Sequence, residues 1–296
     1  MTRTFVSIAC LLTAAGCDPS VPAASCRTDS QCAAGERCVD GRCRAGGDAG
    51  AGAGGRDSGD PSGPRTLVGL EITPADPVVR STNGAPASID LDVVGHFDDG
   101  SSEPLTSAFW SAASSLLGTI DATTGVFTAD GALAGTVEIT VAASSRSATT
   151  TLRVEVSHEI LADGAPGDAA SRFAGPEVTD PAREANLLYP LAGTVFPENV
   201  YPADVQWERG NEGDLYRVRA SVTGVSVTAY VAHTGAGFRY DWLVDRAAWR
   251  ALAESAPETD VTLAVDRWEA TTGEVVAGTP RTFRFADAVI RGSIYY

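Results

Sequence analysis

Cysteine is the residue type whose spacing carries the most chemistry in this chain. The 296-residue sequence has six cysteines, and four of them lie close together in the spacing C-x5-C-x5-C-x4-C: Cys26, Cys32, Cys38 and Cys43. An even set of closely spaced cysteines forms disulfides in an oxidising compartment, and four cysteines allow three pairings. A zinc site is the alternative, but the segment has neither a C-x2-C pair nor a nearby His. The spacing predicts a disulfide knot over residues 17–43, with its pairing open.

Residues 1–16 have the layout of an export signal. Arg3 precedes a short apolar run from Phe5 to Ala15. This arrangement is typical of a secretory signal peptide, and the run is about half as long as a membrane-spanning helix needs. An ordinary signal followed by an incidental cysteine is one interpretation.

The end of this signal favours a second interpretation. Ala14-Ala15-Gly16-Cys17 resembles the lipobox of bacterial lipoproteins, although Ala14 stands where Leu is usual. The resemblance implies that Cys17 is lipidated and becomes the first mature residue, and acyl chains then anchor the protein to a membrane. We therefore expect an exported protein of the cell envelope, at the outer membrane or cell surface.

Other residue types that could do chemistry are sparse. The three histidines, His96, His158 and His233, are far apart, and no G-x-S-x-G, H-E-x-x-H, P-loop or G-x-G-x-x-G motif occurs. Asp98-Asp99 lacks the spacing of a calcium loop and indicates a turn. The sequence therefore predicts no catalytic residue, no cofactor and no metal site, and we expect a non-enzymatic protein.

The charge balance excludes another class of partner. The chain has 22 basic and 38 acidic side chains, a formal net charge of −16, and no Lys. Contact with phosphates needs clustered positive charge, so nucleic-acid binding is not expected.

Composition divides the rest of the chain into linkers and folded segments. Residues 44–64 include eight Gly and cannot bury enough surface to fold, so this segment is predicted to be a flexible linker. Residues 158–185 are rich in Ala, Gly, Pro and Asp and are predicted to be a second connector. Between and after these segments, 65–157 and 186–296 contain short runs of alternating hydrophobicity.

The segment 65–157 reads as a β-sandwich. Alternating apolar residues at Leu70–Pro74, Ile89–Val93 and Val137–Val141 predict half-buried strands. Asp98-Asp99-Gly100 and Thr124-Gly125 predict turns between strands. Several short strands in about ninety residues indicate an antiparallel sandwich, with Trp110 and Phe97 in its centre.

The same segment resembles a known family. Leu70-x-Ile72-x-Pro74, Phe97-Asp98-Asp99-Gly100, Trp110, Gly125-Val126-Phe127 and Gly135-Thr-Val137-x-Ile139-Thr follow in order the pattern of a bacterial Ig-like domain of group 2. The resemblance implies a sandwich of the kind found in surface proteins and adhesins, with no catalytic role and no fixed ligand site.

The segment 186–296 reads as a second β module. Strands are predicted at Leu215–Ala220, Val225–Val231, Val261–Trp268 and Thr282–Phe285, with a hairpin at 271–274 and a helix over Asp241–Ser255. Its opening, Leu187-Leu-Tyr-Pro190 to Trp207, resembles a fibronectin type III-like module. The fold class is therefore all-β, with two Ig-like or fibronectin-like antiparallel sandwiches after a disordered, Cys-rich N-terminal region.

Two functions are compatible with this organisation. One is a lipid-anchored surface protein that displays its sandwiches for adhesion or for binding a surface protein or polysaccharide. The other is a spacer or targeting arm of a larger secreted enzyme or β-propeller protein. The aromatic residues of the second module form either a sugar-binding face or buried core, and core is the usual role of aromatics at such spacing: Tyr230, Tyr240, Trp242, Trp249 and Trp268.

Overall fold

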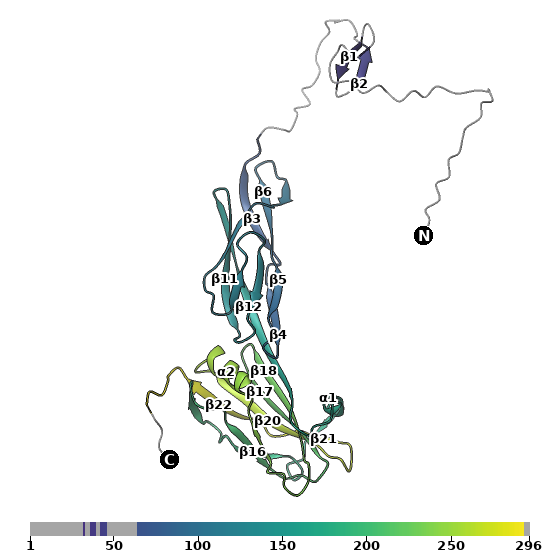
Figure 1. The fold of residues 1–296 in the computed structure, drawn as a ribbon, viewed down its shortest axis with the longest axis vertical. Helices are drawn as coiled ribbons and strands as arrows, with labels where there is room; N and C mark the ends of the chain where they lie inside the picture. The colour runs from purple at the N-terminus through teal and green to yellow at the C-terminus, as the bar shows by residue number, and fades with distance from the viewer. Residues whose placement is uncertain (1–31, 33–35, 40–41, 46–63, 293–296) are drawn as a thin grey trace, which may run out of the picture. The chain divides into compact units, whose positions relative to one another are not determined.

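The computed structural model describes residues 32, 36–39, 42–45 and 64–292, and the chain divides after Pro61 into two compact units. In the first unit, β1 (Glu36–Val39) and β2 (Arg42–Ala45) form an antiparallel hairpin in which Cys38 lies opposite Cys43. The remaining elements belong to the second unit, which is all-β apart from two short helices (Figure 1). Within the described ranges, no helix is both long and apolar enough to cross a membrane.

The first sandwich is built from short strands, as the alternating pattern predicts. They are β3 (Leu67–Thr73), β4 (Val78–Thr82), β5 (Ala87–Asp90), β6 (Asp92–Phe97), β7 (Ser102–Pro104), β8 (Phe109–Ala112), β9 (Gly118–Ile120), β10 (Val126–Ala129), β11 (Gly135–Ala143) and β12 (Arg146–Leu161). One layer contains the sheets β3-β6-β7 and β5-β10-β9, and the other contains β8, β11, β12 and β4. Along β11, buried and exposed residues alternate because one face of the strand packs on the core.

The predicted single strand Ile89–Val93 is wrong in one respect. The chain forms two strands there, β5 and β6, which belong to different sheets. Leu91 lies between them, is 2% exposed, and donates its backbone N–H to the carbonyl of Gly125. Alternation continues through Leu91 because the residue faces the same core while the backbone changes partners.

Trp110 lies in the centre of the first core, as predicted, and is 3% exposed. Gly125 has a φ of +78°, and a Cβ there would come within 2.8 Å of the Trp110 ring, so this turn needs glycine for both reasons. The central position predicted for Phe97 is wrong. Its ring is only partly buried and lies under the guanidinium of Arg65, at the end of the sandwich.

The second sandwich contains all the strands predicted for it from the sequence, together with shorter ones. They are β13 (Glu177–Val178), β14 (Asn186–Tyr189), β15 (Val195–Pro197), β16 (Asp204–Glu208), β17 (Leu215–Val222), β18 (Val225–Ala232), β19 (Asp241–Leu243), β20 (Asp260–Trp268), β21 (Val275–Val276) and β22 (Arg281–Ala286). One layer contains β13-β21-β20-β17-β18, with β22 paired to β20 and β15 paired to β22, and the other contains β14-β16-β19. The turn at 271–274 joins β20 to β21 as a hairpin.

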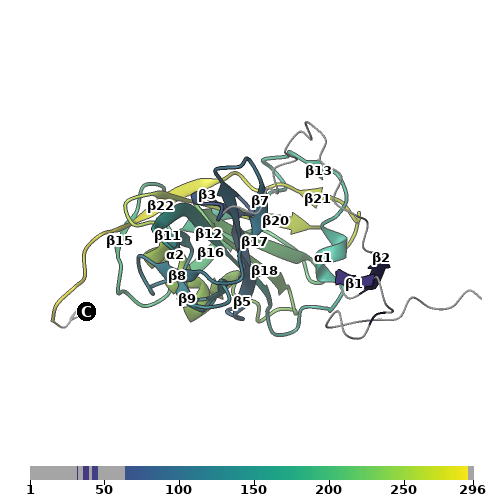
Figure 2. The ribbon, with the colours of Figure 1, turned by 90° about the horizontal axis from the view of Figure 1, so that it is seen from above.

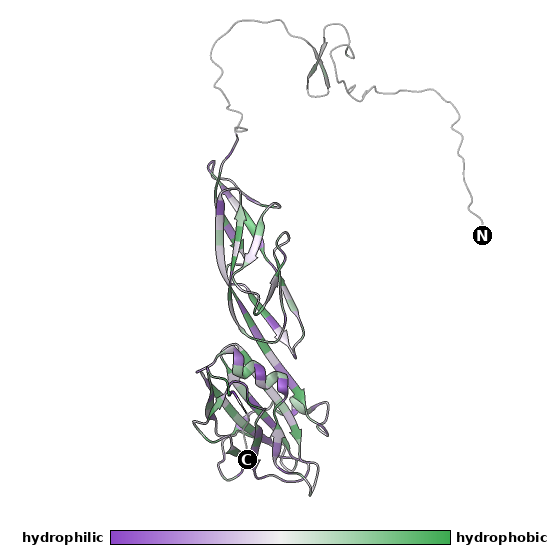
Figure 3. Cartoon of the chain, turned by 60° about the vertical axis from the view of Figure 1, so that its left-hand side comes forward, coloured by the Kyte–Doolittle hydropathy of each residue, from purple (hydrophilic) through white to green (hydrophobic). Residues whose placement is uncertain are grey.

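The predicted helix over Asp241–Ser255 is shorter than expected. Residues Asp241–Leu243 form β19, and the helix α2 covers Arg246–Ser255. Asp245 separates the two elements, because its side chain accepts hydrogen bonds from the backbone N–H groups of Ala247 and Ala248 and so caps the helix. Hydrophilic and hydrophobic residues alternate along α2 (Figure 3), and the apolar face packs on β18.

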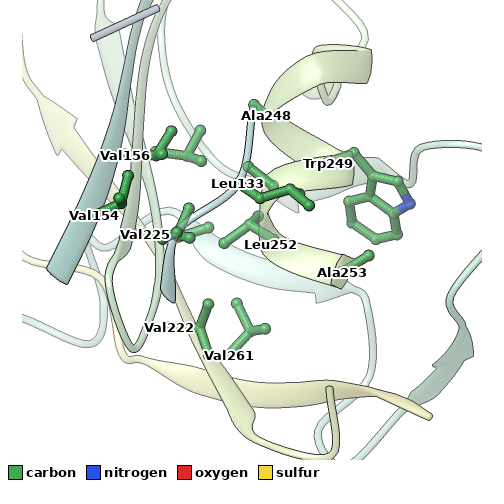
Figure 4. Packing of buried hydrophobic residues seen from close by; sticks show 14 of the residues in the cluster. Leu133, Val154, Val156, Val222, Val225, Ala248, Trp249, Leu252, Ala253 and Val261 are labelled. Carbon is green, nitrogen blue, oxygen red and sulfur yellow. The ribbon is translucent and has the colours of Figure 1, made fainter. Parts of the chain in front are cut away.

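The two sandwiches share one strand and one core. β12 pairs with β4 and β11 in the first sandwich, and its last residues pair in parallel with β18 of the second, from Val156↔Val225 to Leu161↔Tyr230. Leu133, from the loop before β11, is 4% exposed and lies between α2 and the strands carrying Val156 and Val225 (Figure 4). A single cluster of buried apolar residues therefore continues from one sandwich into the other.

The segment 158–185 differs from the connector expected from its composition. Its first residues belong to β12, and the helix α1 (Ala169–Arg172) and Phe173 then pack on Leu215 and Tyr230 of the second sandwich. The two helices lie apart in Figure 2, and α1 contacts a different cluster of buried residues from α2. Small residues and turns in this segment let it follow the sheet closely, which composition alone does not distinguish from a free linker.

Arg217 links this segment to a buried carboxylate of the sheet. Asp266 is 0% exposed and accepts hydrogen bonds from Arg217 (2.8 Å), Arg219 (2.6 and 2.8 Å) and the backbone N–H of Gly278 (3.1 Å). Arg217 also pairs with Glu177 and lies 4.9 Å from the centre of the Phe173 ring. Arg217 thus connects the segment to the sheet, and Arg219 pairs with Asp266 within the sheet.

Candidate functional site

The cysteines of the predicted knot are only partly within the described residues. Cys32 and Cys43 are joined by a disulfide, and Cys38 is also disulfide-bonded. Cys26 and the predicted lipidation residue Cys17 lie outside the described residues. The Cys32–Cys43 disulfide therefore belongs to the predicted set, and lipidation stays a prediction.

The charged and polar residues of the described chain do not gather into a metal site. In these residues, no group of three or more His, Cys, Asp or Glu side chains could hold a metal ion. Asp163, Asp168 and Asp180 lie apart along the segment on the second sandwich, and Asp168 pairs with Arg172.

One triad of residue types does come together on the first sandwich. His96 Nδ1 lies 2.7 Å from Ser102 Oγ, and its Nε2 lies 3.1 Å from a carboxylate oxygen of Glu71. The three residues are neighbours on β3, β6 and β7, and the His96 and Glu71 side chains are 41% and 63% exposed. Water competes for these contacts, so we interpret the three side chains as polar cross-strand pairs on a solvent-exposed face of the sheet.

A groove on the second sandwich combines more of the features of a binding site. It has a volume of about 510 Å³ and lies between the ends of β12 and β18 on one side and β19 on the other. Ile160, Phe238 and Trp242 are partly buried and pack against the core at the groove. Leu161 and Leu243 are 50% and 52% exposed at its sides.

The charged groups that line this groove are all acidic. They are Asp163, Asp241 and Asp245. Asp241 pairs with the exposed Arg239 at 3.2 Å, and Asp245 caps α2 through one carboxylate oxygen. Asp163 has no hydrogen-bond or ion-pair partner among the described residues. The groove therefore combines an apolar floor with negative charge at its margin.

Phe238 connects the groove to a cluster of aromatic rings in the core. Its ring stacks on Tyr216 at 5.7 Å and contacts His233 and Tyr240 at 4.7 and 5.0 Å. The Tyr240 hydroxyl donates to the carbonyl of Gly210 and lies 3.1 Å from His233 Nε2. Tyr216 is buried in the same cluster, and this burial raises the pKa of its hydroxyl. This cluster fixes the loop that carries Phe238, so the groove floor is firmly supported.

A buried histidine lies close behind the groove. His158 on β12 is 5% exposed, and its Nε2 has no hydrogen-bond partner among the described residues. Burial lowers the pKa of His158, and the negative charge of Asp245 opposes this shift only in part. The side chain is thus held in its neutral form at neutral pH.

The five aromatics weighed as a sugar-binding face do not form one surface. Tyr230 and Trp249 are buried, in different clusters, and Trp268 lies under the guanidinium of Arg172. Only Trp242 lines the groove. Sequence reasoning missed Leu161, Phe238 and Leu243, and the one local signal was the run Asp241–Asp245, in which apolar residues lie between two acids.

Comparisons with known proteins concern the fold alone. The sequence matches no family model, and no curated protein matches it. Similar solved structures include S-layer protein SbsC domains 5–6 (12% identity, TM-score 0.24, covering 75% of this chain and 99% of that one). Others are the fibronectin(III)-like modules of Clostridium thermocellum CbhA (13%, 0.22, 77% and 99%) and human protocadherin-24 EC1-2 (12%, 0.25, 75% and 99%). At these values, function has to be argued from the residues of this chain.

Proposed function

We propose that this chain is a non-enzymatic, lipid-anchored bacterial surface protein that displays a pair of β-sandwiches for adhesion or partner binding. The observation that carries the proposal is the continuity of β12 and of the buried core between the sandwiches. A strand and a core shared by both sandwiches resist bending at the joint, so a binding surface on the second sandwich keeps its orientation relative to the first.

The N-terminal sequence supports the anchoring part of the proposal. Cys17 follows a signal-like run, and the Gly-rich residues 44–64 would separate the sandwiches from the lipid headgroups. The similarity of residues 65–157 to a bacterial Ig-like domain of group 2, and of residues 186–296 to a fibronectin type III-like module, also favours a surface role.

The non-enzymatic part rests on where polar groups are used. Buried Asp214, Asp266, Arg267 and Glu269 bond to one another or to neighbouring chain segments. Buried charges in such pairs serve the fold and are not available to a substrate.

Metabolic labelling with palmitate tests the anchor. The wild-type protein should be labelled, and Cys17→Ser should abolish the label, because the acylated sulfur is gone. Cys10→Ser is the matched control, since this residue lies in the part of the signal that is removed, and its label should persist. Label that survives Cys17→Ser contradicts the proposal.

One observation favours the second candidate function, an arm of a larger protein. Tyr189, Tyr201 and Ile290 are 37%, 71% and 36% exposed and line a hollow of about 560 Å³. Exposed apolar patches of this kind often contact another domain. An antibody against the second sandwich would then detect a polypeptide much larger than 30.5 kDa in cell extracts, whereas a single band near the mature mass excludes this candidate.

A further inference from the structure

The backbone of β19 offers unpaired hydrogen-bonding groups beside the groove. In the antiparallel pair β16–β19, Trp207 donates to the carbonyl of Tyr240, and Val244 donates to the carbonyl of Ala203. Backbone groups of successive residues point alternately toward and away from a partner strand. Tyr240, Trp242 and Val244 therefore face β16, and the N–H and C=O groups of Asp241 and Leu243 face away from it.

Nothing in the described part of the chain covers this edge. β19 is the last strand of the sheet β14-β16-β19, and no described residue hydrogen-bonds to the backbone of Asp241 or Leu243. Both residues line the groove, so the space beside the edge is open. An exposed strand edge of this kind is a template for pairing with another strand.

The end of β12, on the opposite side of the groove, also has backbone groups that face away from their partner strand, over fewer residues. The backbone N–H groups of Val156 in β12 and of Ala162, just after it, donate to carbonyls on the β18 side. The N–H of Glu159 points away from β18 and donates to Asn83 Oδ1. The backbone groups of Leu161 follow Glu159 and point away from β18, toward an uncovered edge. The groove thus lies between two open strand edges, one from each layer of the second sandwich.

We propose that this groove binds an extended, basic and apolar polypeptide segment by strand addition to β19. The backbone of the segment would bond to Asp241 and Leu243. Side chains alternate along a strand, so one set would contact Ile160, Phe238 and Trp242, and the other would reach the margin of the groove.

Charge selects the chemistry of the segment. The groove is lined by three carboxylates and no basic side chain, and the whole chain has a net charge of −16. Arg or Lys at alternate positions of the partner would lie near Asp163 and the free carboxylate oxygen of Asp245. A neutral polysaccharide would use the aromatic floor but neither the strand edge nor this charge, so a polypeptide fits the observations better. The inference rests on the proposed display function and names its partner class.

The test uses the purified full-length protein in detergent and a capped ten-residue peptide of alternating Val and Arg as the probe. We expect binding that weakens with salt, and slower hydrogen exchange at the Leu243 amide, since that amide becomes hydrogen-bonded. A peptide with Glu in place of Arg, and one N-methylated at alternate amides, should bind at least tenfold more weakly. Equal binding of either control peptide overturns the proposal.

Two variants of the protein sharpen the test. Leu243→Pro removes the outward N–H and blocks the edge with the proline ring, and proline is tolerated at strand edges, so binding should fall at least tenfold. Leu243→Ala is the matched control, because it keeps the N–H, and it should lose less. Asp163→Arg, at an exposed residue, should weaken binding about fivefold even if the proline variant does not fold.

Other outcomes count against the proposal. Absence of basic-peptide binding at millimolar concentration, or binding of a neutral hexasaccharide in its place, overturns it. Palmitate labelling tests the lipidation of Cys17 independently of these binding measurements. Failure of strand addition and failure of the proposed function are therefore distinguishable.

Discussion

Replacement of Leu133 by Ala tests whether the two sandwiches share one core. The substitution removes Cγ and both Cδ atoms from a residue that is 4% exposed and packed between α2 and β18 (Figure 4). At about 0.8 kcal/mol for each buried carbon, the lost transfer free energy is roughly 2.4 kcal/mol. Incomplete closure of the cavity raises the cost to about 3–4 kcal/mol.

Differential scanning calorimetry of the full-length protein measures the effect. If the core is shared, residues 64–292 unfold in one transition with equal calorimetric and van't Hoff enthalpies. For a unit of this size, the substitution should lower Tm by roughly 6–16 °C. Leu116→Ala is the matched control in the same sandwich, because Leu116 is 66% exposed, and it should change stability by less than about 0.5 kcal/mol. Two wild-type transitions, of which Leu133→Ala moves only one, would show that the sandwiches unfold independently and do not share a core.

Three further predictions concern buried side chains. Trp110→Ala should cost about 3–5 kcal/mol and, because the core is shared, lower the single unfolding transition of both sandwiches in the same calorimetric experiment. Asp266→Asn should cost about 3–5 kcal/mol in urea unfolding, because it removes the buried carboxylate with which Arg217 and Arg219 pair, whereas Asp260→Asn on the exposed face of β20 should have little effect. His158 has a pKa lowered by burial, so the unfolded state takes up its proton first, and stability should fall as the pH drops below about 6.5. His158→Gln should flatten the unfolding free energy between about pH 7.5 and 5.5.

Each of these predictions has a result that would contradict it. For Trp110, that result is an unchanged Tm, which would mean that the side chain is not part of the core. For Asp266, equal urea midpoints of the two Asn variants would show that the buried pairs contribute nothing. For His158, an identical pH slope in wild type and variant would place the titrating group elsewhere.

Most strands could be predicted because each has one buried face. In β11, Val137, Ile139 and Val141 are buried while their neighbours are more exposed, and this alternation is visible in the sequence. The continuation of β12 past Ser157 was not predictable in this way. Residues 158–161 pair with β18, which lies far along the chain, and the Ala- and Gly-rich sequence that follows is typical of a linker.

The groove could not be predicted because its parts meet only in the folded protein. Residues 160–163 lie at and just after the end of β12, Phe238 lies in the loop between β18 and β19, and Trp242 lies on β19. The sequence placed Trp242 on a helix because it is spaced at a helical interval from Trp249 and Leu252. The sequence does contain a signal that separates β19, which carries Trp242, from α2, since Asp245 before good helix formers is typical of an N-cap.

Trypsin treatment of intact cells tests the proposal that lipid on Cys17 holds the sandwiches at the cell surface. Arg44 and Arg56 lie in the Gly-rich segment 44–64 and are the proposed cleavage sites. We expect trypsin to release a folded fragment beginning at Asp57 while a periplasmic marker stays intact, and we expect Cys17→Ser protein in the medium without trypsin. Release of the fragment only after the cells are broken, or retention of Cys17→Ser protein on the cells, would contradict the proposal.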